Sequence, residues 1–199
     1  EALLERMGLR HPLVRCHTLY LLAATSWARG DAAGALQRCR DAYDTGPAVT
    51  CRDFSIRACT NLAYHVFLLG HLADARAICS QMIETGIRYA GVDWSGKGLL
   101  AVPLGVGEYF AYNLEEARHL LEEGCAASRC GGFMRDYYMG AYYLTRCLHA
   151  QGDAERALVV IREARSVAQA AGNMGVDANL SGLEDEICPG GAATAAWRR

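Results

Sequence analysis

The sequence predicts an all-α protein built as an open stack of about four to five antiparallel helix pairs, an α-solenoid. Three observations support this prediction. Apolar residues recur at helical spacing along most of the 199 residues. Short turn signals interrupt these segments at similar distances, and small residues recur at a fixed place around each interruption. Self-similarity at a fixed period of about 40 residues indicates stacked helical repeats.

Four alanines show the period most clearly. They are Ala35, Ala75, Ala117 and Ala157, separated by 40, 42 and 40 residues. Each follows by five residues an interruption near 30, 70, 112 or 152. A small residue precedes the interruption by seven in three cases, Ala23, Ala63 and Gly105, and Thr145 occupies this place in the fourth. Small residues let antiparallel helices approach closely, and we expect Ala75 and Ala117 to be buried where the helices of a pair meet.

The first repeat is expected near residues 11–46. Its long helix covers His11–Arg29, with Pro12 in the first turn, where proline is tolerated. Gly30-Asp31 interrupts the pattern, and Asp31 is suited to cap the shorter second helix. Gly46-Pro47 is expected to stop that helix.

The second repeat is expected near residues 51–86. Arg52–Leu69 is its long helix, and Gly86 is expected to end the short one. Upstream, Glu1–Leu9 has the apolar spacing of one helix face, which indicates the last helix of a preceding repeat.

The third repeat is expected near residues 97–128, with Leu99–Ala111 as its long helix. Pro103 lies inside this helix, so we expect a kink there or a start shifted toward residue 102. The break falls at Tyr112-Asn113, and Arg129–Gly132 forms the turn to the next repeat.

The fourth repeat is expected near residues 133–172, with Phe133–Ala150 as its long helix. One more helix is expected at Val176–Ile187, so residues 1–187 form one helical repeat domain with partial helices at both ends. Residues 188–199 contain Pro-Gly-Gly followed by small residues, which is typical of a linker or a disordered tail.

Charge and composition argue against several functional classes. The formal net charge is −2, without the clustered basic face of a nucleic-acid reader, so we expect no direct nucleic-acid contact. No apolar run has transmembrane length, and no membrane partner is expected. The nine cysteines include no CxxC pair, and Cys39 and Cys79 occupy matching positions on a buried stripe. We therefore expect reduced core thiols and a cytoplasmic protein.

Two stretches resemble a known family of repeats. Residues Glu108–Gly124 read EYFAYNLEEARHLLEEG, and residues Gln151–Leu158 read QGDAERAL. The leucine followed by a small residue on the first three long helices, and the Gly-Asp-x-x-x-Ala element of the second stretch, resemble the tetratricopeptide repeat (TPR), whose usual period is about 34 residues. The longer period and the tyrosine, Asn-Leu and acidic-acidic-Ala run resemble the TPR-like solenoid of MalT-type regulators in the LuxR family of bacterial transcription factors.

The resemblance implies a modular regulator. An ATPase module would lie upstream, this sensing or interaction solenoid in the middle, and a helix-turn-helix DNA-binding module downstream. DNA binding, and any self-association, would then be properties of the full-length protein.

One stretch nearly matches a phosphate-binding loop. Gly91–Gly98 reads GVDWSGKG, but Gly98 stands where the pattern needs Ser or Thr, and the preceding Gln81–Ala90 is helical instead of a strand. We expect an inter-repeat loop without a nucleotide role. No zinc spacing, nucleophile elbow or acid–base pair is present, so we expect no catalytic residue, metal, cofactor or enzyme activity in this segment.

In a TPR-like stack, the first helix of each pair lines the concave side. This places nine candidate groove residues: Tyr20, Trp27, Arg57, Tyr64, Phe67, Tyr109, Tyr142, Arg146 and His149. Aromatic rings stack and arginines form paired hydrogen bonds, so the groove suits a peptide, a partner helix or a small effector such as a sugar. The alternative for each aromatic is packing between repeats.

The leading hypothesis is a signal-sensing and protein-interaction domain of a MalT-type LuxR-family regulator, which binds an effector or partner on its concave face. The alternative is an interaction scaffold from another multidomain signalling protein, such as an ATPase or cyclase with TPR-like repeats. A helix-turn-helix module beyond Arg199 would favour the first.

Overall fold

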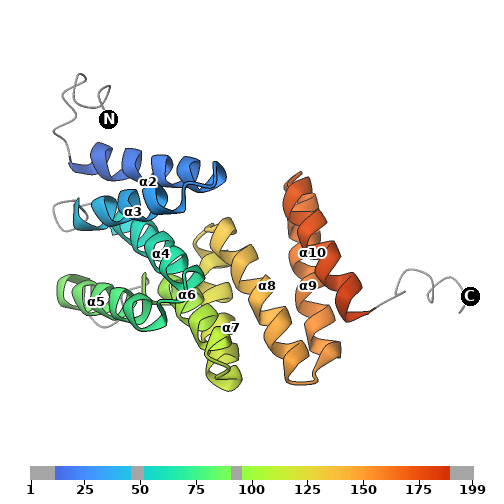
Figure 1. The fold of residues 1–199 in the computed structure, drawn as a ribbon. Coiled ribbons are helices and arrows are strands. Elements are labelled where there is room, and N and C mark those ends of the chain that lie inside the picture. The colour runs from blue at the N-terminus through green and yellow to red at the C-terminus, as the bar shows by residue number, and fades with distance from the viewer. Residues whose placement is uncertain (1–11, 46–51, 91–95, 189–199) are drawn as a thin grey trace, which may run out of the picture.

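The computed structural model describes residues 12–45, 52–90 and 96–188. These ranges form nine α-helices and contain no β-strand (Figure 1). The helices are α2 (Pro12–Ala28), α3 (Ala32–Thr45), α4 (Arg52–Leu68), α5 (Leu72–Ala90), α6 (Gly96–Phe110), α7 (Leu114–Cys130), α8 (Met134–Ala150), α9 (Ala154–Ala170) and α10 (Met174–Ile187). The helix predicted at Glu1–Leu9 and the tail predicted after Cys188 lie outside the described residues.

Successive helices pack as pairs, α2 with α3, α4 with α5, α6 with α7 and α8 with α9, and α10 packs on α9 and α8. The first helices also contact one another in series: α2 with α4, α4 with α6, α6 with α8 and α8 with α10. Figure 1 shows an open, curved stack that runs from α2 at one end to α10 at the other. We call α2, α4, α6, α8 and α10 the inner layer, and the remaining helices the outer layer.

Six of the turns share one geometry. At Gly152, whose φ is 84°, the N–H donates to the carbonyl of His149 at 2.9 Å. The next N–H, of Asp153, donates to the carbonyl of Leu148 at 2.9 Å, which completes a Schellman motif. The same pattern occurs at residues 30, 70, 112, 132 and 172. The interruptions predicted at 30, 70, 112 and 152 are therefore confirmed.

Tyr112 is the exception among these turn residues, because it adopts a φ of 63° without being glycine. A side chain in this left-handed region costs roughly 1–2 kcal/mol, and 77% of this residue is exposed, so little packing offsets the cost. Tyr112→Gly should therefore raise the free energy of unfolding by about 1 kcal/mol in urea denaturation. The control Gly152→Ala should lower it by a similar amount. A Tyr112→Gly variant less stable than the wild type would contradict this strain.

The small residues lie where the period predicts. Ala35, Ala75, Ala117 and Ala157 are all 0% exposed, so the prediction that Ala75 and Ala117 are buried is confirmed. Cys39 and Cys79 are buried at matching positions of the outer layer, and every described cysteine is a free thiol.

Two helix boundaries differ from the prediction. Helix α5 continues through Gly86 to Ala90, so the expected end at Gly86 is wrong. Helix α6 begins at Gly96 and continues through Pro103, so its start is not shifted toward residue 102. An interior glycine costs only about 1 kcal/mol. A proline costs about 3 kcal/mol, but nine of the 15 residues of α6 are buried, and this packing outweighs the lost hydrogen bond.

A candidate binding pocket on the inner layer

Side chains of α4 and α8, the two neighbours of α6 in the inner layer, are in contact at two places. Arg135, at the start of α8, donates a hydrogen bond to Oδ1 of Asn61 on α4. The guanidinium carbon of Arg57 on α4 lies 4.8 Å from the centre of the Phe133 ring, just before α8. These contacts divide the inner layer into an N-terminal part on α2 and α4 and a C-terminal part on α8 and α10.

Two predicted groove residues are buried. Tyr64 is 5% exposed and packs with Val102 and Val106 of α6. Phe67 is 3% exposed, and a Cβ added to Gly107 would stand 2.1 Å from its Cε1. Both rings therefore pack between repeats, which is the alternative that the sequence left open.

On the N-terminal part, Trp27 covers a buried histidine. The rings of Trp27 and His65 stack with centroids 4.3 Å apart, and Nδ1 of His65 lies 3.4 Å from Sγ of Cys39. Burial, with a smaller effect of the Arg135 charge, lowers the pKa of His65 to about 4. Burial also raises the pKa of Cys39 to about 12. Both groups are therefore uncharged at neutral pH, unlike the activated thiolate of a nucleophilic cysteine.

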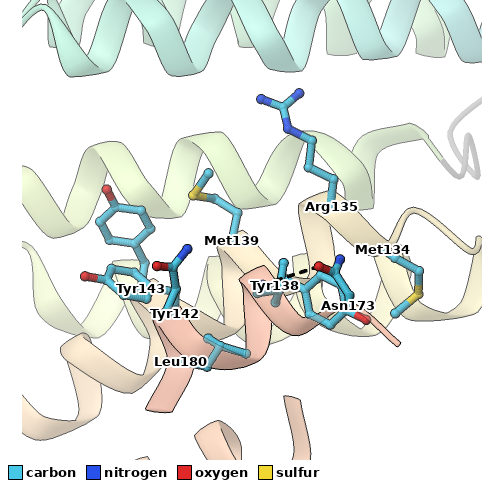
Figure 2. A pocket seen from close by; sticks show the side chains of 10 residues that line it. Met134, Arg135, Tyr138, Met139, Tyr142, Tyr143, Asn173 and Leu180 are labelled. Carbon is cyan, nitrogen blue, oxygen red and sulfur yellow. Dashed lines mark hydrogen bonds between the residues drawn. The ribbon is translucent and has the colours of Figure 1, made fainter. Parts of the chain in front are cut away.

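On the C-terminal part, a pocket of about 530 Å³ lies between α8 and α10 (Figure 2). Helix α8 contributes Met134, Arg135, Tyr138, Met139, Tyr142 and Tyr143. The turn before α10 and α10 itself contribute Asn173, Val176, Asn179 and Leu180. Figure 2 shows Arg135 and Met139 extending from α8 away from α10, which places the guanidinium at the edge of the pocket.

The tyrosines that line the pocket, Tyr142 and Tyr143, contact residues outside it. The Tyr143 ring packs against Tyr109 of α6, with centroids 5.7 Å apart. The guanidinium carbon of Arg146 lies 5.1 Å from the Tyr142 ring centre, and its Nη2 pairs with Oε2 of Glu186 on α10 at 3.2 Å. The ion pair ties α8 to α10 beside the pocket, so the pocket wall connects two repeats.

Comparison with solved structures identifies the fold. RapI in its apo form matches with a TM-score of 0.64 and 11% identity, over 87% of this chain and 63% of RapI. BtubC (BKLC) from P. vanneervenii matches with a TM-score of 0.59 and 13% identity, over 92% of this chain and 84% of that one. A putative kinesin light chain from Podosopora anserina, with nearly identical TPR-like repeats, matches with a TM-score of 0.57 and 14% identity. The match covers 96% of this chain and 99% of that one.

The chain is a TPR-like α-solenoid. The predicted fold class is therefore confirmed, and so is the TPR-like part of the resemblance. No family model matches the sequence, and no curated protein does either. The chain spans about 63% of the length of RapI.

The TPR-like solenoid does not bring the nine predicted groove residues into one groove, and the contact of Arg135 with Asn61 lies between the two parts of the inner layer. Trp27 and Arg57 lie on the N-terminal part, whereas Tyr142 lines the pocket and Arg146 flanks it. Of the others, Tyr20 stacks with His17, Tyr109 packs behind Tyr143, His149 is exposed near the end of α8, and Tyr64 and Phe67 are buried.

The contribution of α10 was missed from the sequence. The sequence predicts Val176–Ile187 only as one more helix at the end of the domain and places none of its residues on the inner layer. The 40-residue period contains the missing signal, since Asn179 follows Met139 by one period. Both residues line the pocket. Extending the period by one more helix would have located its second wall.

The near match to a phosphate-binding loop at Gly91–Gly98 gains little support as a nucleotide site. Gly91–Ser95 of the near phosphate-binding loop lie outside the described residues, and the loop follows helix α5 instead of a strand. Within the described ranges, no three His, Cys, Asp or Glu side chains gather where they could hold a metal ion. None of the described helices combines the length and apolarity needed to cross a bilayer.

Proposed function

We propose that this TPR-like solenoid is the signal-sensing segment of a MalT-type LuxR-family transcriptional regulator. It binds an effector or partner on the inner layer, and it carries out no chemistry and needs no cofactor. The pocket between α8 and α10 is the observation that supports this proposal most directly. It has the volume of a ligand site and combines apolar walls with a few polar groups, as binding pockets do.

The position of the pocket between two repeats allows ligand binding to change the spacing of these repeats. Its walls belong to successive repeats, and each repeat of a solenoid contacts only its neighbours. A ligand that fits one spacing of α8 and α10 better than another shifts the population toward that spacing. In the full-length regulator, this shift would be passed through α10 to the DNA-binding module.

The arrangement of the gene provides the first test. The proposal expects a nucleotide-binding module upstream of this segment and a basic helix-turn-helix module downstream. A full-length protein without the helix-turn-helix module would overturn the regulator proposal and favour the interaction scaffold of another signalling ATPase or cyclase.

Transcript levels provide the second test, in cells that express the full-length protein. Tyr142→Ala, in the pocket, should change the output of the regulated promoters by about fivefold or more. The control His119→Ala, exposed on the outer layer, should leave the output unchanged. Equal output from Tyr142→Ala and the wild type would argue against the pocket as the sensing site.

A further inference from the structure

The pocket between α8 and α10 contains one positive charge and no negative charge in its lining. Arg135 is the only ionised side chain among the lining residues. Its guanidinium carries five N–H donors, and Asn61 accepts from Nη1 alone among the hydrogen bonds of the described residues. The neighbouring carboxyl, Asp136, does not line the pocket. The lining therefore favours a ligand that carries a negative charge.

A buried hydroxyl in the same lining lacks a partner. Tyr138 is only 7% exposed, and its hydroxyl has no hydrogen-bond partner among the described residues. Leaving such a group unpaired costs about 1–3 kcal/mol. Tyr138 follows Arg135 by three residues on α8, and both residues line the pocket. An acceptor on a bound ligand would satisfy this hydroxyl.

The rest of the lining is apolar or aromatic. Met134, Met139, Val176 and Leu180 supply aliphatic and thioether surface, and Tyr142 supplies an aromatic face. Methionine side chains adapt to irregular shapes, and aromatic faces stack on planar groups. The body of the ligand should therefore be aromatic or branched aliphatic, with the charge at one end.

The size and surroundings of the pocket favour a small molecule over a peptide. A volume of about 530 Å³ falls in the range of small-molecule sites. An extended peptide laid across the first helices would have to pass between α4 and α8, where Arg135 and Asn61 are in contact.

We propose that the pocket between α8 and α10 binds a small organic anion, with its acidic group at Arg135 and an acceptor at the Tyr138 hydroxyl. The aromatic or branched body of this organic acid lies against Tyr142 and the two methionines. This inference rests on the proposed function, because it names the class of effector for the same pocket.

Two fluorescent probes of nearly equal shape test the charge requirement. Anilinonaphthalene sulfonate carries an anionic group on an aromatic body, and phenylnaphthylamine has a similar body without the charge. Titrated into the purified chain, the sulfonate should bind one site more tightly than the neutral probe. Arg135→Gln should weaken sulfonate binding by about fivefold and leave the neutral probe unchanged.

Three further variants separate charge, hydroxyl and location. Arg135→Lys should retain most of the affinity for the sulfonate, and Tyr138→Phe should weaken it without affecting the neutral probe. Asn179→Trp, at an exposed position of the lining, should block both probes. The control Arg40→Gln, exposed on α3, should change neither. Thermal melting of each variant confirms that it is folded.

Several results would overturn the inference. The inference fails if the sulfonate does not bind the wild type, or if the two probes bind with equal affinity. It also fails if the sulfonate still binds the Asn179→Trp variant. Displacement of the sulfonate only by acidic peptides would replace the small molecule with a protein segment. Normal promoter regulation without anion selectivity would reject this inference alone. Anion selectivity without promoter regulation would reject the regulator instead.

Discussion

Ala117→Glu should lower the free energy of unfolding by about 4 kcal/mol or more. Ala117 is 0% exposed and belongs to a buried cluster with Leu121, Leu144 and Cys147. Overpacking such a position costs about 1–3 kcal/mol. The added carboxylate would be buried without a partner, or would have to be protonated, and either adds a further cost of several kcal/mol. This loss approaches the whole stability of many domains, about 5–15 kcal/mol.

The matched control for Ala117→Glu lies on the same helix. Ala126→Glu changes the same residue type on α7, but at an exposed position, so its effect should stay within about 0.5 kcal/mol. Urea denaturation followed by far-UV circular dichroism measures both variants. Unchanged denaturation of Ala117→Glu would show that this face of α7 does not pack against its partner helix as described.

The parts of the fold that the sequence predicts are those that local chemistry determines. A residue of positive φ closes each Schellman turn, and glycine there is visible in the sequence at positions such as 30, 70 and 152. Buried alanines at a fixed distance from each turn follow from the same local repeat. Gly86 misled the prediction because an interior glycine costs a helix only about 1 kcal/mol. Pro103 misled it because the buried residues of α6 offset the lost hydrogen bond.

The candidate site was less predictable because it depends on contacts between distant residues. Arg135 and Asn61 are 74 residues apart in the chain, and their contact decides that the inner layer is divided. No spacing in the sequence shows that α4 and α8 are in contact. Tyr142 could be placed on the correct face from the repeat, whereas the burial of Phe67 depends on the missing side chain of Gly107.

Gly124→Leu should lower the free energy of unfolding by about 3 kcal/mol, against the helix propensity of the new residue. Leucine is favoured over glycine inside a helix by roughly 1 kcal/mol. Gly124 is buried on α7, however, and a Cβ there would stand 2.5 Å from Cγ2 of Val102 and 2.8 Å from its backbone nitrogen. Because a backbone atom is in the way, α6 and α7 must move apart, and overpacking outweighs the gain in propensity.

The control Gly182→Leu should change stability in the opposite direction. Gly182 lies inside α10, is exposed, and has nothing within 4 Å of an added Cβ. Only the higher helix propensity of leucine then acts, so the free energy of unfolding of this variant should rise by about 0.5–1 kcal/mol. Both variants are measured by urea denaturation with the wild type in parallel. If Gly124→Leu were as stable as Gly182→Leu, the close approach of α6 and α7 at Val102 would be wrong, and with it the reason for a glycine at residue 124.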